Sequence, residues 1–216
     1  MDYRKKYLFR AEVAGWVLRW VPFLRLAGLN GSIVRGEESE QSDIDFLIIA
    51  KAARLYTARF FATAFIHLTL WRRYGNKVAG RICLNCFLSD KNPDIAPRNP
   101  KSREKVARAY KYLVPLVDSG NAAGRFFKVN RWMDGEPSVI SRQSSVVKYN
   151  NKLQKKLIPN GSKKPVRFLE IYLKGRFGDW VEKRLMNFQI RRILAGKVRG
   201  DETVATKTQI RLHPKK

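Results

Sequence analysis

Residues 30–49 read NGSIVRGEESEQSDIDFLII, and this stretch places a Gly-Ser pair and a spaced pair of aspartates on either side of an acidic loop. The apolar run before Gly31 is typical of a strand, so the Gly-Ser pair predicts a tight turn after it. Residues two apart on a strand face the same side of a sheet. Asp43 and Asp45 are therefore expected to share one face, with Ile44 on the other.

The residue types in this stretch indicate a particular chemistry. The backbone N–H groups and the hydroxyl of a Gly31-Ser32 turn can meet a phosphate, especially if the next residues begin a helical turn. Two carboxylates beside such a turn are suited to Mg²⁺ that is held jointly by protein and triphosphate. The metal would lower the pKa of an attacking hydroxyl. Glu37, Glu38 and Glu40 are interpreted as solvated loop residues.

The segments around this stretch alternate between helical and strand periodicity. The predicted elements are a helix over 3–20, a strand over 23–29, a strand over 44–49, a helix over 53–73 and a strand over 81–88. The apolar positions expected on the first helix are Leu8, Val13, Trp16, Val17 and Trp20. This order predicts an α/β (α+β) core in which helices cover a small mixed sheet.

The second half of the chain has a different character. Three prolines in residues 90–100 predict a connection, so the expected division is a core over 1–95 and a basic, mainly helical region over 96–216. Helices are predicted over 101–118 and over 167–194, the latter with Val181, Leu185 and Phe188 on its apolar face. Between these helices, residues 143–165 are polar and basic, as in a loop.

Positive charge is concentrated in this second half. The chain has 44 Lys and Arg against 18 Asp and Glu, a net charge of +26, and residues 91–216 carry +20 of it. Such an excess favours a polyanionic partner, with nucleic acid, RNA in particular, preferred over an acidic membrane surface. Basic and aromatic residues alternate over 126–132 and 167–177, which suits either phosphate contact with base stacking or a core with cationic stems over it.

The two cysteines have C-x-x-C spacing but lie within the predicted strand over 81–88. Residues three apart on a strand face opposite sides, so we interpret Cys83 and Cys86 as core cysteines. The chain has only two histidines, His67 and His213, and no second cysteine pair, which does not favour a zinc site.

No segment predicts an integral membrane helix or a cleavable leader. The most apolar run, residues 56–71, is shorter than the ~20 residues of a membrane span. Its Arg59, Thr63 and His67 form a polar stripe typical of a helix that covers a sheet. The cytoplasm is the expected compartment, and attachment to a membrane surface through the first helix and the basic face is a weaker alternative.

The pattern Gly31-Ser32, ten intervening residues and Asp43-x-Asp45 resembles the signature of the polymerase-beta-type nucleotidyltransferase superfamily, particularly its minimal nucleotidyltransferase branch. The resemblance covers roughly residues 23–90. It implies that Gly31 and Ser32 hold the β- and γ-phosphates of an NTP and that Asp43 and Asp45 bind Mg²⁺ or Mn²⁺. Arg35 has two interpretations, a phosphate contact or a salt bridge within the acidic loop.

One position departs from the family pattern. Family members supply a third carboxylate from a neighbouring strand, and the polar residue inside the strand over 81–88 is Asn85. An asparagine can coordinate a metal weakly, but it takes no proton and carries no charge. Either Asp90 or one of the loop glutamates replaces the missing carboxylate, or the chemistry is slow, or the site binds a nucleotide without turnover.

Two functional hypotheses follow. The first is a metal-dependent nucleotidyltransferase that moves NMP from an NTP to a hydroxyl acceptor, RNA among the candidates, with release of pyrophosphate. The second is a weak or inactive module of the same fold that binds RNA or another polyanion. The sequence does not identify the acceptor or the oligomeric state.

Overall fold

The computed structural model describes residues 2–75, 77–97, 99–140, 150, 153, 157, 167–196 and 203–212. The predicted loop over 143–165 lies almost wholly outside these residues, as does His213. The helices of the first half are α1 (Tyr3–Leu18), α2 (Ser32–Arg35), α3 (Leu55–Leu68), η1 (Pro100–Ser102) and α4 (Arg103–Tyr110). Those of the second half are α5 (Ala122–Val129), η2 (Arg131–Gly135), α6 (Pro137–Ile140), α8 (Arg167–Tyr172) and α9 (Gly175–Ala195).

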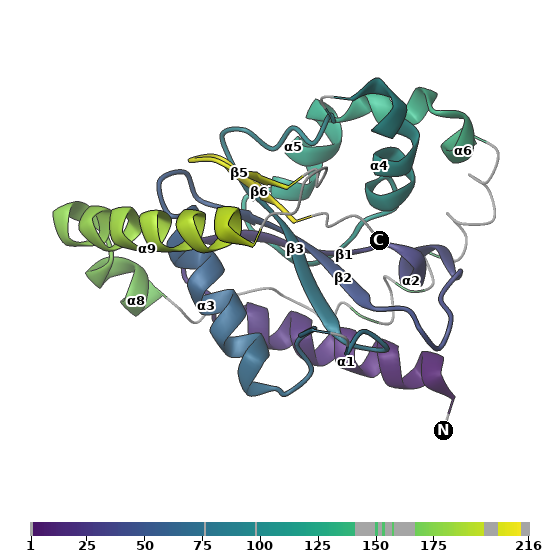
Figure 1. Cartoon of the computed structure of the whole chain (residues 1–216), viewed down its shortest axis with the longest axis horizontal. Coiled ribbons are helices and arrows are strands. Elements are labelled where there is room, and N and C mark those ends of the chain that lie inside the picture. Colours follow the sequence, from purple (N-terminus) through teal and green to yellow (C-terminus); the bar gives the residue numbers. More distant parts are fainter. Residues whose placement is uncertain are drawn as a thin grey trace.

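The described residues form one mixed sheet of six strands. The strands are β1 (Leu24–Asn30), β2 (Ile44–Ala50), β3 (Ile82–Ser89), β4 (Val114–Asp118), β5 (Val204–Ala205) and β6 (Gln209–Arg211). Their order is β4-β1-β2-β3-β6-β5, in which only the β2–β3 pair is parallel. The predicted fold class, an α/β core with a mixed sheet followed by a mainly helical region, is confirmed (Figure 1).

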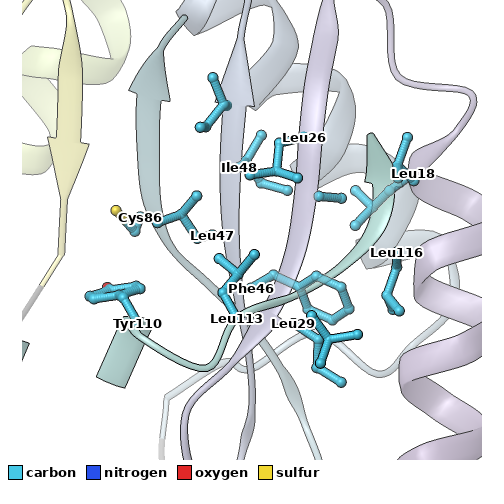
Figure 2. Packing of buried hydrophobic residues seen from close by; sticks show 14 of the residues in the cluster. Leu18, Leu26, Leu29, Phe46, Leu47, Ile48, Cys86, Tyr110, Leu113 and Leu116 are labelled. Atoms are coloured by element: carbon cyan, nitrogen blue, oxygen red, sulfur yellow. The ribbon is translucent and has the colours of Figure 1, made fainter. Parts of the chain in front are cut away.

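The central strands β1 and β2 are buried over nearly their whole length, which requires cover on both faces of the sheet. Helices α1 and α3 contact each other and the strands, and α5 contacts β1 and β4. Figure 1 shows α4, α5 and α6 together on the side of the strands away from α1. Figure 2 shows side chains from β1, β2, β4 and α1 meeting in the core, among them Leu29, Phe46, Leu116 and Leu18.

The prediction of one helix over 101–118 is wrong in its second half. Helix α4 ends at Tyr110, and residues 114–118 form β4, which pairs with β1. Pro115 cannot continue a helix, and the β-branched residues Val114 and Val117 favour an extended chain. Strands from the predicted helical region, β4, β5 and β6, therefore belong to the same sheet as β1–β3. The expected division at residue 95 does not follow the edge of that sheet.

Two helices bury only part of the faces that the sequence predicted. On α1 the buried residues are Tyr7, Leu8, Ala11, Ala14, Gly15 and Leu18, whereas Trp16 and Trp20 are exposed. On α9 the buried residues are Gly178, Glu182 and Gln189, and Phe188 is exposed. The predictions for Trp16, Trp20 and Phe188 are therefore wrong, whereas Leu8 of α1 is buried and Leu185 of α9 packs partly buried against the core, as predicted.

Candidate active site

Asp43 and Asp45 come together with Cys83 at one end of the parallel pair β2–β3. Asp45 is the second residue of β2, Asp43 lies just before the strand, and Cys83 is beside Asp45 in the register with β3. One ligand atom from each of the three lies within 4.8 Å of the others, and all three residues are half-buried. The structure thus brings the two predicted aspartates together, and it adds Cys83, which the strand pattern assigned to the core.

Two asparagines flank Asp45 on the neighbouring strands. Asn85 of β3 donates a hydrogen bond from Nδ2 to Asp45 Oδ1 at 2.9 Å, and Asn30 of β1 is directly opposite Asp45 in the antiparallel register. Among the described residues, the buried Oδ1 atoms of both asparagines have no hydrogen-bond partner. A buried oxygen without a donor is costly. These oxygens therefore provide acceptor capacity beside the carboxylates.

The Gly31-Ser32 turn is packed directly against Asp45. Gly31 has φ +82°, and a Cβ at this position would lie 2.7 Å from Asp45 Oδ2, so only glycine fits. The Gly31 N–H donates to the carbonyl of Ala109 at 3.1 Å and so does not point to a ligand. Within the described part of the chain, the Ser32 hydroxyl has no hydrogen bond.

Arg35 holds the turn and the acidic loop together. Its Nη1 donates to the carbonyls of Gly31 and Arg108, both at 2.8 Å, and its Nε donates to Glu37 at 2.9 Å. These contacts agree with the second interpretation of Arg35, a salt bridge within the acidic loop. A contact between Arg35 and a phosphate stays a prediction.

The interpretation of the loop glutamates as solvated is wrong for two of the three. Glu37 accepts from Arg35 and from Arg108 Nη2, at 2.8 Å in the latter case. Glu38 has a side chain only 2% exposed and pairs with Arg4 at 2.8 Å. Glu40 is exposed. The basic excess of the chain provides these partners, so the loop carboxylates are structural.

None of the candidates for a third carboxylate reaches the site. Asp90 follows the far end of β3, where it accepts from the Ala52 N–H at 2.8 Å and lies 3.8 Å from Arg25. Among the described residues, the cluster around Asp43 and Asp45 contains no other Asp or Glu. Asn85 therefore occupies the strand position from which a third carboxylate was expected.

Arg73 is a site residue that the sequence pattern did not reveal. Its Nη1 donates to Asp43 Oδ2 at 2.5 Å and lies 3.8 Å from Cys83 Sγ. The Arg73 N–H donates to the carbonyl of Ile82 at 2.9 Å, which holds this segment along the start of β3. Arg73 follows α3 in a run of basic residues without a motif, so only the tertiary structure identifies it.

The two cysteines lie in different surroundings, and both are free. Burial and the neighbouring Asp45 and Asp43 carboxylates raise the pKa of the Cys83 thiol well above its usual range. Cys86 is fully buried, which raises its pKa to about 12, and its side chain lies beside Tyr110 (Figure 2). The prediction of a core cysteine is confirmed for Cys86. Cys83 is instead a neutral thiol at the acidic site.

The donor set fits a hard cation. Mg²⁺ and Mn²⁺ prefer oxygen ligands, and the site offers the carboxylates of Asp43 and Asp45 together with the unpartnered Oδ1 of Asn85. A protonated thiol is a poor ligand for such ions, so Cys83 does not belong to this set. Asp43 and Asp45 thus lie close together, and Asn85 contacts Asp45 through its Nδ2, while a metal ligand role for the three residues stays a prediction.

The comparisons with known proteins concern the same part of the chain. Residues 22–115, which contain Gly31, Asp43, Asp45 and Asn85, match the family model of the nucleotidyltransferase domain. No curated protein and no solved structure matches the chain.

Proposed function

We propose that the protein, whose residues 22–115 match the family model of the nucleotidyltransferase domain, moves a nucleoside monophosphate from a nucleoside triphosphate to a hydroxyl group. The observation that supports this most directly is the contact between the Gly31-Ser32 turn and the Asp43–Asp45 pair. This contact supports the proposal because the Ser32 hydroxyl and the two carboxylates would then act on the same triphosphate. In the reaction, the acceptor oxygen bonds to the α-phosphorus, pyrophosphate leaves, and the hydroxyl proton passes to a carboxylate or to water.

The residues of the chain divide these tasks. Asp43, Asp45 and Asn85 would hold Mg²⁺ or Mn²⁺, which supplies charge neutralisation on the triphosphate and acidifies the acceptor hydroxyl. Ser32 offers its hydroxyl to the β- or γ-phosphate. Gly31 fixes the turn because any larger residue would displace Asp45. Arg73 balances the charge of Asp43, and RNA is the acceptor class that the net charge of +26 favours.

The test is transfer of label from α-labelled NTPs, with Mg²⁺ and bulk RNA, to material larger than the nucleotide. Wild type is expected to transfer label, and Asp43→Asn/Asp45→Asn is expected to lose at least 100-fold, on the order of what charge-stabilising groups contribute. Glu104→Gln is a suitable control, since its carboxylate is exposed and outside the site. Equal transfer by wild type and the double variant would exclude this function.

A second candidate is a module that binds RNA without catalysis. The observation that favours it is Asn85, which stands where the family pattern has a third carboxylate, without another Asp or Glu in the described cluster. This candidate predicts salt-sensitive RNA binding that persists in Asp43→Asn/Asp45→Asn, without transfer of label by any form of the protein. Binding that does not respond to salt would contradict it.

A further inference from the structure

Three arginines from separate parts of the chain gather beside β3. Arg59 lies on α3, Arg72 lies between α3 and β3, and Arg192 lies on α9, which packs on α3 (Figure 1). Arg59 Nη1 donates to Gln189 Oε1 at 2.6 Å, and Gln189 Nε2 donates to the carbonyl of Tyr56 at 3.0 Å. Arg192 follows Gln189 by three residues, so it extends from the same side of α9. We call Arg59, Arg72 and Arg192 the arginine cluster.

The arginine cluster lacks the neutralising partners that other arginines have. Arg54, Arg73 and Arg108 each pair with a carboxylate. In contrast, no carboxylate among the described residues lies within 4.0 Å of any member of the cluster, and the buried Nε of Arg59 has no hydrogen-bond partner there. Burial, together with the charges of Arg72 and Arg192, lowers the pKa of Arg59 to about 10. Gathering like charges in this way is costly unless an anion offsets them.

The position of the cluster relative to the candidate active site indicates which anion. Arg72 precedes Arg73, which donates to Asp43. The backbone of Arg72 forms an isolated parallel β-bridge with Ile82 at the start of β3. The Gly31-Ser32 turn follows β1, on the other side of β2 in the strand order. The arginine cluster therefore lies on the β3 side of β2, where Arg59 is over the ring of Phe87, and the Gly31-Ser32 turn lies on the β1 side.

We propose that Arg59, Arg72 and Arg192 bind a phosphate group that the hydroxyl acceptor carries, separate from the triphosphate of the nucleotide. The identification of the ligand as the acceptor rests on the function proposed above. The existence of an anion site rests on the arginine cluster itself. The phosphate belongs either to a nucleic acid strand or to a small phosphorylated alcohol. Three guanidinium groups from different elements are suited to such a group because each offers several donors in a fixed plane.

Binding measurements test this without any need for turnover. The probes are a fluorescein-labelled single-stranded RNA decamer, followed by anisotropy at several salt concentrations, and glycerol 3-phosphate, followed by calorimetry. Mg-ATP binding is measured in parallel by equilibrium dialysis. The variant is Arg72→Gln/Arg192→Gln, and the matched control is Arg176→Gln/Lys183→Gln. The control removes the same charge from exposed positions nearer the start of α9.

The double variant is expected to bind the RNA or glycerol 3-phosphate at least tenfold more weakly, with the affinity for Mg-ATP unchanged. If RNA is the ligand, the slope of log K against log salt falls by about 1.4 for two lost contacts. Arg192→Gln alone changes an exposed side chain, so folding is not at issue, and it should give about half of that change. A loss with RNA alone identifies a nucleic acid strand, and a loss with glycerol 3-phosphate alone identifies a small acceptor.

Three results would overturn the proposal. These are unchanged binding of both probes, an equal loss in the control variant, and a loss of Mg-ATP affinity as large as the loss for the probe. The proposed function can fail independently: a protein that transfers no label but loses probe binding in Arg72→Gln/Arg192→Gln has the anion site without the enzyme.

Discussion

Arg73 offsets part of the negative charge at the Asp43–Asp45 pair. Arg73 donates to Asp43 at 2.5 Å, so it provides the positive charge that a metal ion would otherwise supply to that carboxylate. The side chain of Arg73 is 32% exposed, which makes this a partly screened pair with a modest contribution of its own. A cation at the carboxylates therefore competes with Arg73 or shares Asp43 with it.

Replacing Arg73 tests this competition. Arg73→Gln is expected to bind Mn²⁺ about fivefold more tightly, which corresponds to roughly 1 kcal/mol for a partly exposed ion pair. Electron paramagnetic resonance of free Mn²⁺ gives the dissociation constant. Arg25→Gln is the control, because Arg25 lies at the other end of the sheet beside Asp90. Weaker Mn²⁺ binding by Arg73→Gln would show instead that Arg73 organises the site for the metal.

The lowered pKa of Glu37 predicts that the stability of the protein depends on pH. Burial raises the pKa of this carboxyl, but hydrogen bonds from Arg108 and Arg35 outweigh burial and lower the pKa from 4.5 to about 2. A carboxyl with a lowered pKa in the folded state stabilises the protein above its unfolded pKa, and this contribution is lost as pH falls. Glu37→Gln should therefore be less stable than wild type at pH 7, and the difference should shrink from about pH 4.5 toward pH 2.

Urea unfolding of wild type and Glu37→Gln at pH 7, 4 and 3 measures that difference. Glu40→Gln is the control, because Glu40 is exposed in the same loop. A difference that stays constant down to pH 3 would show that the ion pairs with Arg35 and Arg108 do not stabilise the fold.

Among the elements, α9 attaches to α3 through polar contacts. Glu182 of α9 accepts from the N–H groups of Tyr56 and Thr57, at 2.9 and 2.8 Å, and from the Thr57 hydroxyl at 2.6 Å. The residue before α3 is Arg54, whose side chain makes no capping hydrogen bond. A carboxylate from a distant helix thus satisfies donors in the first turn of α3, where the helix dipole also favours negative charge.

Removing this long-range cap should weaken the docking of α9. Glu182→Ala leaves buried donors of α3 without a partner, so the free energy of unfolding is expected to fall by about 2 kcal/mol. Chemical denaturation followed by circular dichroism measures the change. Lys183→Ala, one residue along and exposed, should change it by less than about 0.5 kcal/mol. Similar values for the two variants would mean that the contacts of Glu182 add nothing to the fold.

Across the whole molecule, residues 203–212 complete the six-stranded sheet. Strand β6 pairs with β3 through Phe87 and Ile210, and Leu212 N–H donates to the carbonyl of Asn85 at 2.8 Å. The strand that carries Cys83 and Asn85 is therefore held between β2 and a segment more than 110 residues later in the chain.

No helix among the described residues is long and apolar enough to cross a membrane.

Replacing Ile210 tests the packing of β6 on β3, because the Ile210 side chain is fully buried. Ile210→Ala is expected to lower the free energy of unfolding by about 2–5 kcal/mol, as for other buried aliphatic truncations. Lys207→Ala in the exposed turn between β5 and β6 should have little effect on the same urea titration. A loss below about 0.5 kcal/mol for Ile210→Ala would contradict the packing of β6 on β3.

The sequence predicted the local elements and the aspartate pair because these depend on short-range rules. Strand periodicity placed Asp43 and Asp45 on one face, and the motif from Gly31 to Asp45 spans only 15 residues. It did not predict β4, since helical spacing over 101–118 concealed the extended run from Val114 to Asp118. It also missed Arg73 and Asn30, which reach Asp45 or Asp43 only through the pairing of strands.

By itself the sequence determined the fold class and the residues of a nucleotidyltransferase-type motif, because backbone propensity and side-chain alternation are local properties. Tertiary structure alone decided that no third carboxylate among the described residues joins Asp43 and Asp45, that Glu37 and Glu38 are paired, and that Arg59, Arg72 and Arg192 are neighbours. These are properties of segments brought together by packing, and the energies of burial and charge that govern them depend on distances in space.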